Sequence, residues 1–144
     1  MTSAPAERLP AVDPSSYLGL ARELARRSEP VARRSAVDRA YYAAFLAMRE
    51  AFRVKHYPLE KGRNEHSAVV NTVSALRQDI GDQQKRLYDL RNLVTYNVGE
   101  VVFPEGTSVE WALATARIVI RMARGLPARP SRQSKLNLPA KRRS

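Results

Sequence analysis

Apolar side chains recur three or four positions apart along most of this chain, and that spacing places them on one face of an α-helix. The longest stripe predicts a helix over residues 30–54, which Pro30 opens at a first helical position. Asp13-Pro14, an N-cap residue followed by proline, opens a shorter stripe and predicts a helix over about residues 14–28. The first part of the chain is therefore predicted to be two consecutive helices.

Two more helical patterns follow in the middle of the chain. Asn64 is a good N-cap for a third helix, whose apolar face runs from Val69 to Leu76 and can extend to Ile80. Gly81-Asp82 then matches a helix stop followed by a cap. We therefore place the start of a fourth helix at this point and its end near Gly99.

A fifth helix is predicted over about residues 108–124, where Thr107-Ser-Val-Glu110 matches a capping box. The run Val101-Val102-Phe103-Pro104 has no partner strand and is interpreted as a loop. Helices joined by short connections favour an up-and-down bundle. We therefore predict an all-α fold, a five-helix antiparallel bundle over residues 14–125 between a disordered leader (1–13) and a disordered basic tail (126–144).

Positive charge is abundant and unevenly distributed. The formal net charge is +11, and six basic residues with no acidic one lie after residue 126. Such a balance attracts polyanions, of which nucleic acid is the commonest. Arginine greatly outnumbers lysine, which favours forked contacts to phosphate but fits a coding bias of the genome equally well.

The residues present disfavour several kinds of chemistry. The absence of cysteine excludes disulfides, thiolate metal sites and cysteine nucleophiles. His56 and His66 lack metal-ligand spacing, the carboxylates are scattered, and no Gly-rich phosphate loop or Ser-His-Asp arrangement occurs. We expect no metal, no cofactor and no ordinary small-molecule enzyme. No apolar run is long enough to span a membrane and no secretory signal precedes the first helix, so we expect a cytoplasmic protein.

Three segments resemble the HEPN domain (higher eukaryotes and prokaryotes nucleotide-binding), in the order that this family uses and over roughly residues 15–125. They are the small-residue helix with Tyr41-Tyr42 before Ala and an aromatic residue, the pair His66-Ser67, and Leu90-Arg91-Asn92-Leu93-Val94-Thr95-Tyr96-Asn97. In the family signature, an Arg that is often followed by Asn precedes a His by four to six residues. Here Tyr96 stands in place of that His. Other branches of the family end in Ala-Asp-Tyr, and this chain is closer to them, with Val94-Thr95 in place of Ala-Asp.

The resemblance implies a bundle that often dimerises, binds RNA or a nucleotide, and acts in toxin-antitoxin, phage-defence or CRISPR-linked systems. Active members are metal-independent endoribonucleases in which Arg stabilises the developing charge and His transfers protons. Tyr96 is a poor general base, because the pKa of tyrosine is about 10. The catalytic residues implied are Arg91, Tyr96 and His66. Those implied in RNA or nucleotide binding are Arg91, Asn92, Arg39, Tyr42, Arg142 and Arg143.

Three functions remain open at this point. The first is an RNA-binding or nucleotide-binding protein with weak or no catalytic activity, and the second is an endoribonuclease toxin. The third is a helical module that binds a nucleotidyltransferase-like partner such as an antitoxin. Structural roles compete with all three: Tyr41 and Tyr42 suit packing, Arg91 and Asn92 can fix the fourth helix, and His66 can be solvated in a first turn.

Helical geometry adds an expectation about assembly. Arg91 and Tyr96 are five positions apart, so on a continuous helix they lie about 140° apart around the axis. Asn92 and Tyr96, four apart, share a face. We therefore expect that Arg91 and Tyr96 do not form a compact site on one continuous helix. A shared site would need the helix to loosen near Thr95 or a second protomer to supply its own Arg91, and we predict a homodimer built largely from the second and fourth helices.

Overall fold

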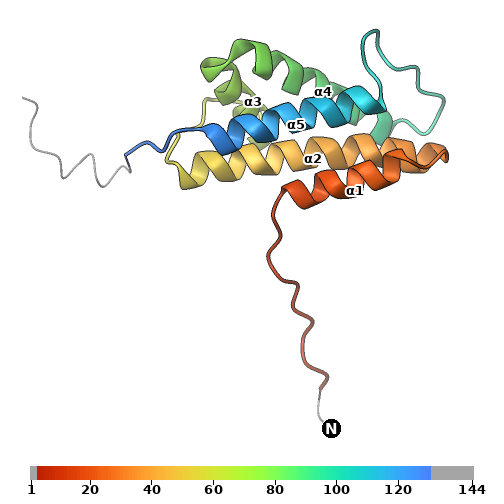
Figure 1. The fold of residues 1–144 in the computed structure, drawn as a ribbon, viewed down its shortest axis with the longest axis horizontal. Coiled ribbons are helices and arrows are strands. Elements are labelled where there is room, and N and C mark those ends of the chain that lie inside the picture. Colours follow the sequence, from red (N-terminus) through yellow and green to blue (C-terminus); the bar gives the residue numbers. More distant parts are fainter. Residues whose placement is uncertain (1–2, 131–144) are drawn as a thin grey trace, which may run out of the picture.

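The computed structural model describes residues 3–130, and in them the chain forms five helices and no strand. The helices are α1 (Ser15–Ala25), α2 (Pro30–Val54), α3 (Glu65–Leu76), α4 (Gln78–Tyr96) and α5 (Val109–Gly125) (Figure 1). The prediction of an all-α five-helix bundle is confirmed. Residues 3–13 are exposed and form no helix or strand, whereas most of the predicted basic tail, residues 131–144, lies outside the described residues.

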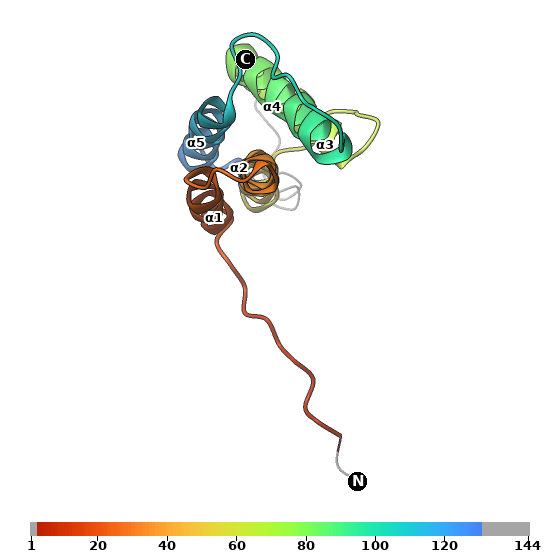
Figure 2. The same cartoon turned by 90° about the vertical axis from the view of Figure 1, so that its right-hand side faces the viewer.

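Helix α2 is the centre of the bundle and contacts each of the other four helices. Figure 2 shows α1 and α5 on one side of α2 and α3 and α4 on the other. Small side chains allow this close approach, since Ala36, Ala40, Ala43 and Ala44 are all fully buried. Larger apolar side chains such as Met48 and Phe52 fill the remaining space in the core.

Helices α1 and α4 run antiparallel to α2, whereas α5 runs in the same direction as α2. Lys55 at the end of α2 donates to the carbonyl oxygens of Ala123 and Arg124 at the end of α5, at 3.1 and 3.2 Å. The loop over residues 55–64 explains the parallel pair, because it returns the chain along α2 before α3 begins. His66, in the first turn of α3, thus stacks on Phe45 near the middle of α2, with ring centroids 4.2 Å apart.

The boundary between α3 and α4 was predicted wrongly. Helix α3 ends at Leu76, the extended residue Arg77 alone separates the two helices, and α4 already contains Ile80 and Gly81. Gly81 does not end a helix but permits a close contact between two helices, because a Cβ at this position would lie 2.6 Å from the Cα of Ser74. The absence of a side chain therefore lets α4 pack directly on α3.

The predicted helix starts are confirmed in one case and shifted in another. Asn64 caps α3, since its Oδ1 accepts from the Ser67 N–H at 2.9 Å and the Ser67 hydroxyl accepts from the Asn64 N–H at 3.1 Å. At α5 the cap is Ser108, whose hydroxyl accepts from the Trp111 N–H at 2.9 Å. Over residues 3–130, no helix is both long and apolar enough to cross a lipid bilayer.

Candidate functional site

One face of α2 carries charged and aromatic side chains toward α3 and α4. These residues are three or four positions apart and thus line up along the helix: Arg34, Asp38, Tyr41, Phe45 and Arg49. Their partners on the facing helices include two residues that the sequence singled out, His66 and Arg91. We call Asp38, Tyr41, His66, Arg91 and Tyr96 the Arg91 cluster.

Asp38 and Arg91 form a half-buried ion pair between α2 and α4. The Arg91 Nε donates to the Asp38 Oδ1 at 2.9 Å, and the two side chains are 19% and 21% exposed. Burial works to lower the pKa of Arg91, but the hydrogen bond and charge of Asp38 outweigh it and the pKa is raised. The guanidinium is therefore fixed in position and remains charged.

Tyr41 and His66 form the second polar contact of the cluster, with 2.5 Å between the phenol oxygen and Nδ1. Burial raises the pKa of Tyr41, and the nearby Tyr88 adds to this effect. Burial also lowers the pKa of His66, as does the positive charge of Arg91. At neutral pH the structure therefore holds a protonated phenol against a neutral imidazole.

These two protonation states select one tautomer of His66. The Tyr41 hydroxyl has no other hydrogen-bond partner among residues 3–130, and a buried hydroxyl that donates to nothing is costly. Tyr41 therefore donates to Nδ1, which must be unprotonated, and the imidazole proton lies on Nε2. His66 consequently offers an N–H donor and no free basic nitrogen.

Arg91 and Tyr96 do meet within one protomer, contrary to the expectation from helical geometry. The guanidinium carbon lies 5.6 Å from the centre of the Tyr96 ring and 5.5 Å from that of Tyr41. The angle between the two positions on the helix was misleading, because both side chains are long and Tyr96 is the last residue of α4. Tyr96 is 73% exposed, so its hydroxyl reaches solvent beside the guanidinium.

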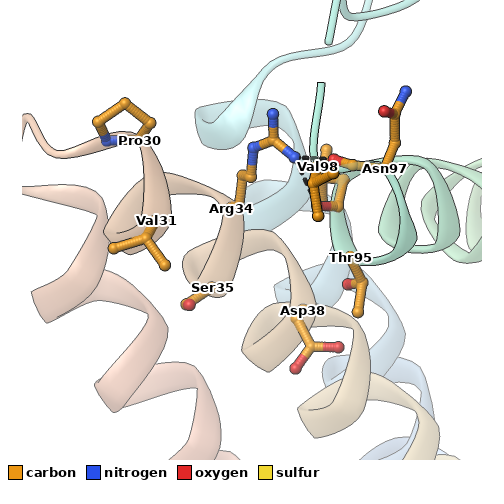
Figure 3. A pocket seen from close by; sticks show the side chains of 9 residues that line it. Pro30, Val31, Arg34, Ser35, Asp38, Thr95, Asn97 and Val98 are labelled. Atoms are coloured by element: carbon orange, nitrogen blue, oxygen red, sulfur yellow. Dashed lines mark hydrogen bonds between the residues drawn. The ribbon is translucent and has the colours of Figure 1, made fainter. Parts of the chain in front are cut away.

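A groove of about 420 Å³ adjoins the cluster, between the first half of α2 and the end of α4 (Figure 3). Its lining includes Val31, Arg34, Asp38, Thr95 and Val98. The Arg34 guanidinium donates to the backbone oxygen of Val94 in the last turn of α4 and to those of Asn97 and Gly99 just after the helix. Arg34 thus closes one end of the groove and fixes the end of the helix that carries Arg91.

Replacing Arg34 by alanine is expected to lower the free energy of unfolding by about 1 kcal/mol, since the carbonyls at the end of α4 lose their donors. Chemical denaturation monitored by circular dichroism measures the change. Arg34→Lys is the matched variant, because it keeps the positive charge but lacks the forked guanidinium. Its free energy of unfolding should lie between those of Arg34→Ala and the unchanged protein. Equal stability of Arg34→Ala and the unchanged protein would contradict the capping role.

The remaining residues implied by the resemblance are placed differently. Asn92 belongs beside the cluster, where its Oδ1 accepts from the Arg91 Nη1 at 3.0 Å. Arg39 lies 3.7 Å from the Asp38 carboxylate. Tyr42 points to the other side of α2 and packs edge-on against Tyr17 of α1, with ring centroids 5.1 Å apart. Arg142 and Arg143 lie outside the described residues.

Sequence reasoning missed the importance of Asp38. Its signal was a single acid within an apolar stripe, three positions before Tyr41. The partner, Arg91, is 53 residues away, so only the fold shows that the two are paired. Tyr88 was also missed, although it lies one helical turn before Arg91 and its ring stacks on His66 at 5.5 Å.

The cluster has the chemistry of an anion site. The Arg91 Nη2 has no hydrogen-bond partner within the part of the chain that the structure describes, and His66 Nε2–H and the Tyr96 hydroxyl add further donors. Asp38 is bound to Arg91, and Glu65 beside His66 is bound to Arg49 at 3.0 Å. Residues 3–130 contain no group of three or more His, Cys, Asp or Glu residues that could hold a metal ion.

Comparisons with models of protein families, with curated proteins and with solved structures give no match for this chain.

Stability should depend on pH through His66. The pKa of His66 is lowered from 6.5 in the folded protein, so the unfolded chain takes up the proton first as the pH falls. The free energy of unfolding is therefore at its full value above about pH 6.5 and decreases toward the pKa of the folded state. Urea unfolding at pH 7.5, 6.5 and 5.5 measures this decrease. His66→Gln should reduce it, and an unchanged decrease in that variant would show that another group is responsible.

Proposed function

We propose that this chain is a HEPN-type RNA-binding protein, in which the Arg91 cluster binds the phosphodiester backbone without cleaving it. The observation that carries the proposal is that one protomer gathers Arg91, His66 and Tyr96 around shared neighbours, with donors left over on Arg91 and His66 and no unpaired carboxylate among them. Phosphate oxygens accept such charge-assisted hydrogen bonds, and arginine is well suited to them. The net charge of +11 adds long-range attraction for a polyanion.

Binding is favoured over cleavage by the protonation states in the cluster. Cleavage by attack of a 2′-hydroxyl requires a group that accepts its proton at neutral pH. His66 cannot serve as that base, because Tyr41 occupies its Nδ1 and its Nε2 carries the proton. Tyr41 cannot serve either, because burial raises the pKa of its phenol. A toxin-antitoxin or defence setting with a nucleotidyltransferase-like partner belongs to the same proposal and follows from the family resemblance.

The homodimer stays a prediction. Its original reason was the separation of Arg91 and Tyr96, and that reason no longer applies because the two side chains meet in one protomer. The groove between α2 and the end of α4 carries two apolar side chains, Val31 and Val98, that are 72% and 101% exposed. Burial of these side chains against a second protomer would favour association.

Titration of a 5′-labelled single-stranded RNA in EDTA tests the proposed function. Fluorescence anisotropy measures binding, and a denaturing gel of the same samples measures cleavage. We expect saturable binding with the RNA intact. Cleavage that Arg91→Ala abolishes would establish the ribonuclease in its place. Complete competition by a mononucleotide at equal phosphate concentration would identify a nucleotide site. If no RNA bound even at low salt, the remaining function would be that of a helical module that binds a protein partner.

A further inference from the structure

Helices α1 and α5 lie on the other side of α2 from α3 and α4 (Figure 2), and a second basic surface lies between them. It is a groove of about 440 Å³, and four arginines line it: Arg22, Arg117, Arg121 and Arg124. Arg22 comes from α1 and the other three follow one stripe of α5. No acidic residue lines this groove within the described part of the chain.

The arginines of this groove lack the close carboxylate partners that several arginines elsewhere on the bundle have. Arg26, Arg33, Arg49, Arg77 and Arg91 each have a carboxylate oxygen within 3.1 Å. In residues 3–130, by contrast, Arg22, Arg117 and Arg121 form no ion pair, and Arg124 has only Asp13 at 3.9 Å. Like charges three or four positions apart destabilise a helix. Repulsion among the three arginines of α5 therefore destabilises this helix, and a bound anion would offset that repulsion.

The shape of the groove favours a narrow polymer strand as its ligand over a flat membrane surface. Gly19 lies in its lining without a side chain, and a Cβ built there meets nothing within 4 Å. The backbone of α1 is therefore open to a ligand, while Leu18 and Ile120 give the groove an apolar part. A flat membrane contacts protruding cations, whereas a concave groove between two helices admits a narrow chain.

The spacing of the arginines fits a repeating anion. Arg117 and Arg124 are seven residues apart on α5, which is about 10 Å along the helix axis. One phosphate cannot contact all four guanidinium groups across that span, whereas successive phosphates of one strand can. Guanidinium groups also match phosphate oxygens in a forked geometry.

We infer that the α1–α5 groove binds the phosphodiester backbone of a single RNA strand. The inference takes the identity of the ligand from the proposed function, but its residues are separate from the Arg91 cluster. We expect this surface to contribute affinity for RNA but no recognition of bases, because its arginines are placed to contact phosphates. The bundle then contacts RNA on two faces.

Gly19 offers a test that leaves the packing undisturbed. Gly19→Glu places a negative charge in the groove, and Gly19→Gln is the matched neutral control; a Cβ at this position meets nothing within 4 Å. We expect Gly19→Glu to weaken single-stranded RNA binding about fivefold, as one unit-charge interaction at about 4 Å in water implies. Gly19→Gln should bind within about twofold of the unchanged protein. Equal affinities of the two variants would overturn the inference.

Salt dependence gives a second, independent measurement on the full chain. The double variant Arg117→Gln/Arg121→Gln should flatten the slope of log affinity against log salt by about 1.4, since each phosphate contact on a single strand contributes about 0.7. An unchanged slope would overturn the inference. So would a loss of binding to phosphatidylserine vesicles by this variant with RNA binding intact, because the occupant would then be a lipid surface.

The outcomes separate this inference from the proposed function. If Arg91→Ala weakens RNA binding and the groove variants do not, the proposed function stands and the groove is excluded. If the groove variants weaken binding and Arg91→Ala does not, the groove stands and the Arg91 cluster is excluded as a binding site. If the unchanged protein binds no RNA, both are overturned.

Discussion

Replacing Arg91 by alanine is expected to weaken RNA binding by about ten- to a hundredfold. Hydrogen bonds to charged groups contribute about 1.5–3 kcal/mol each, and about 1.4 kcal/mol corresponds to a factor of ten in affinity. The substitution also leaves the Asp38 carboxylate, only 21% exposed, with Arg39 at 3.7 Å as its remaining partner, and its negative charge then repels phosphate. Anisotropy titration with a short single-stranded RNA at fixed salt measures the loss.

Two further variants separate a binding role from a structural one. Arg91→Ala with Asp38→Asn removes the ion pair as a whole, so that no half-buried charge is stranded; it should fold well and still bind weakly. Arg53→Ala removes one positive charge from the end of α2, where the side chain is exposed and paired with Glu50. It should bind almost normally. If Arg53→Ala and the single variant Arg91→Ala, which each remove one positive charge, lost affinity equally, Arg91 would contribute only to net charge.

Substitution of Gly81 by alanine is expected to lower the free energy of unfolding by up to about 3 kcal/mol. A Cβ there would lie 2.0 Å from the Ser74 hydroxyl oxygen and 2.6 Å from the Ser74 Cα, so that α3 and α4 must move apart. Overpacking of this kind costs about 1–3 kcal/mol. The direction is diagnostic, because alanine in place of glycine normally stabilises a helix by about 1 kcal/mol. Thermal or urea denaturation measures the difference.

Gly19→Ala is the matched control for Gly81→Ala. It makes the same chemical change inside α1, where a Cβ meets nothing within 4 Å, and it should stabilise the protein. Equal stability of the two alanine variants would show that α3 and α4 are not in close contact at Ser74.

Much of the fold follows from the sequence, because the spacing of apolar residues determines where helices form. The long stripe from Val37 to Phe52 predicted α2 with its observed bounds, Pro30–Val54. The failure at Gly81 has a physical cause: a glycine that ends a helix and a glycine that admits a neighbouring helix look the same in a sequence. The parallel direction of α2 and α5 depends on the path of the loop over residues 55–64, which apolar spacing does not encode.

The candidate site was predictable only in part. The family resemblance pointed to His66, Arg91 and Tyr96, and the structure places His66 and Arg91 against Tyr41 and places Tyr96 against Arg91. The sequence could not show the pairing of Asp38 with Arg91 or the hydrogen bond that sets the tautomer of His66, because both join residues on different helices. The α1–α5 groove was hidden for the same reason, since Arg22 and Arg117 are far apart along the chain.

The central claim is that the Arg91 cluster binds the RNA backbone through fixed donors. Nitrogen-15 NMR of the imidazole of His66 and the Nε of Arg91, recorded during titration with a short single-stranded RNA in EDTA, tests it most directly. We expect that free His66 carries its proton on Nε2, that the His66 and Arg91 signals shift together as RNA binds, and that the RNA stays intact. A proton on Nδ1, or signals that do not move while RNA is bound, would contradict it.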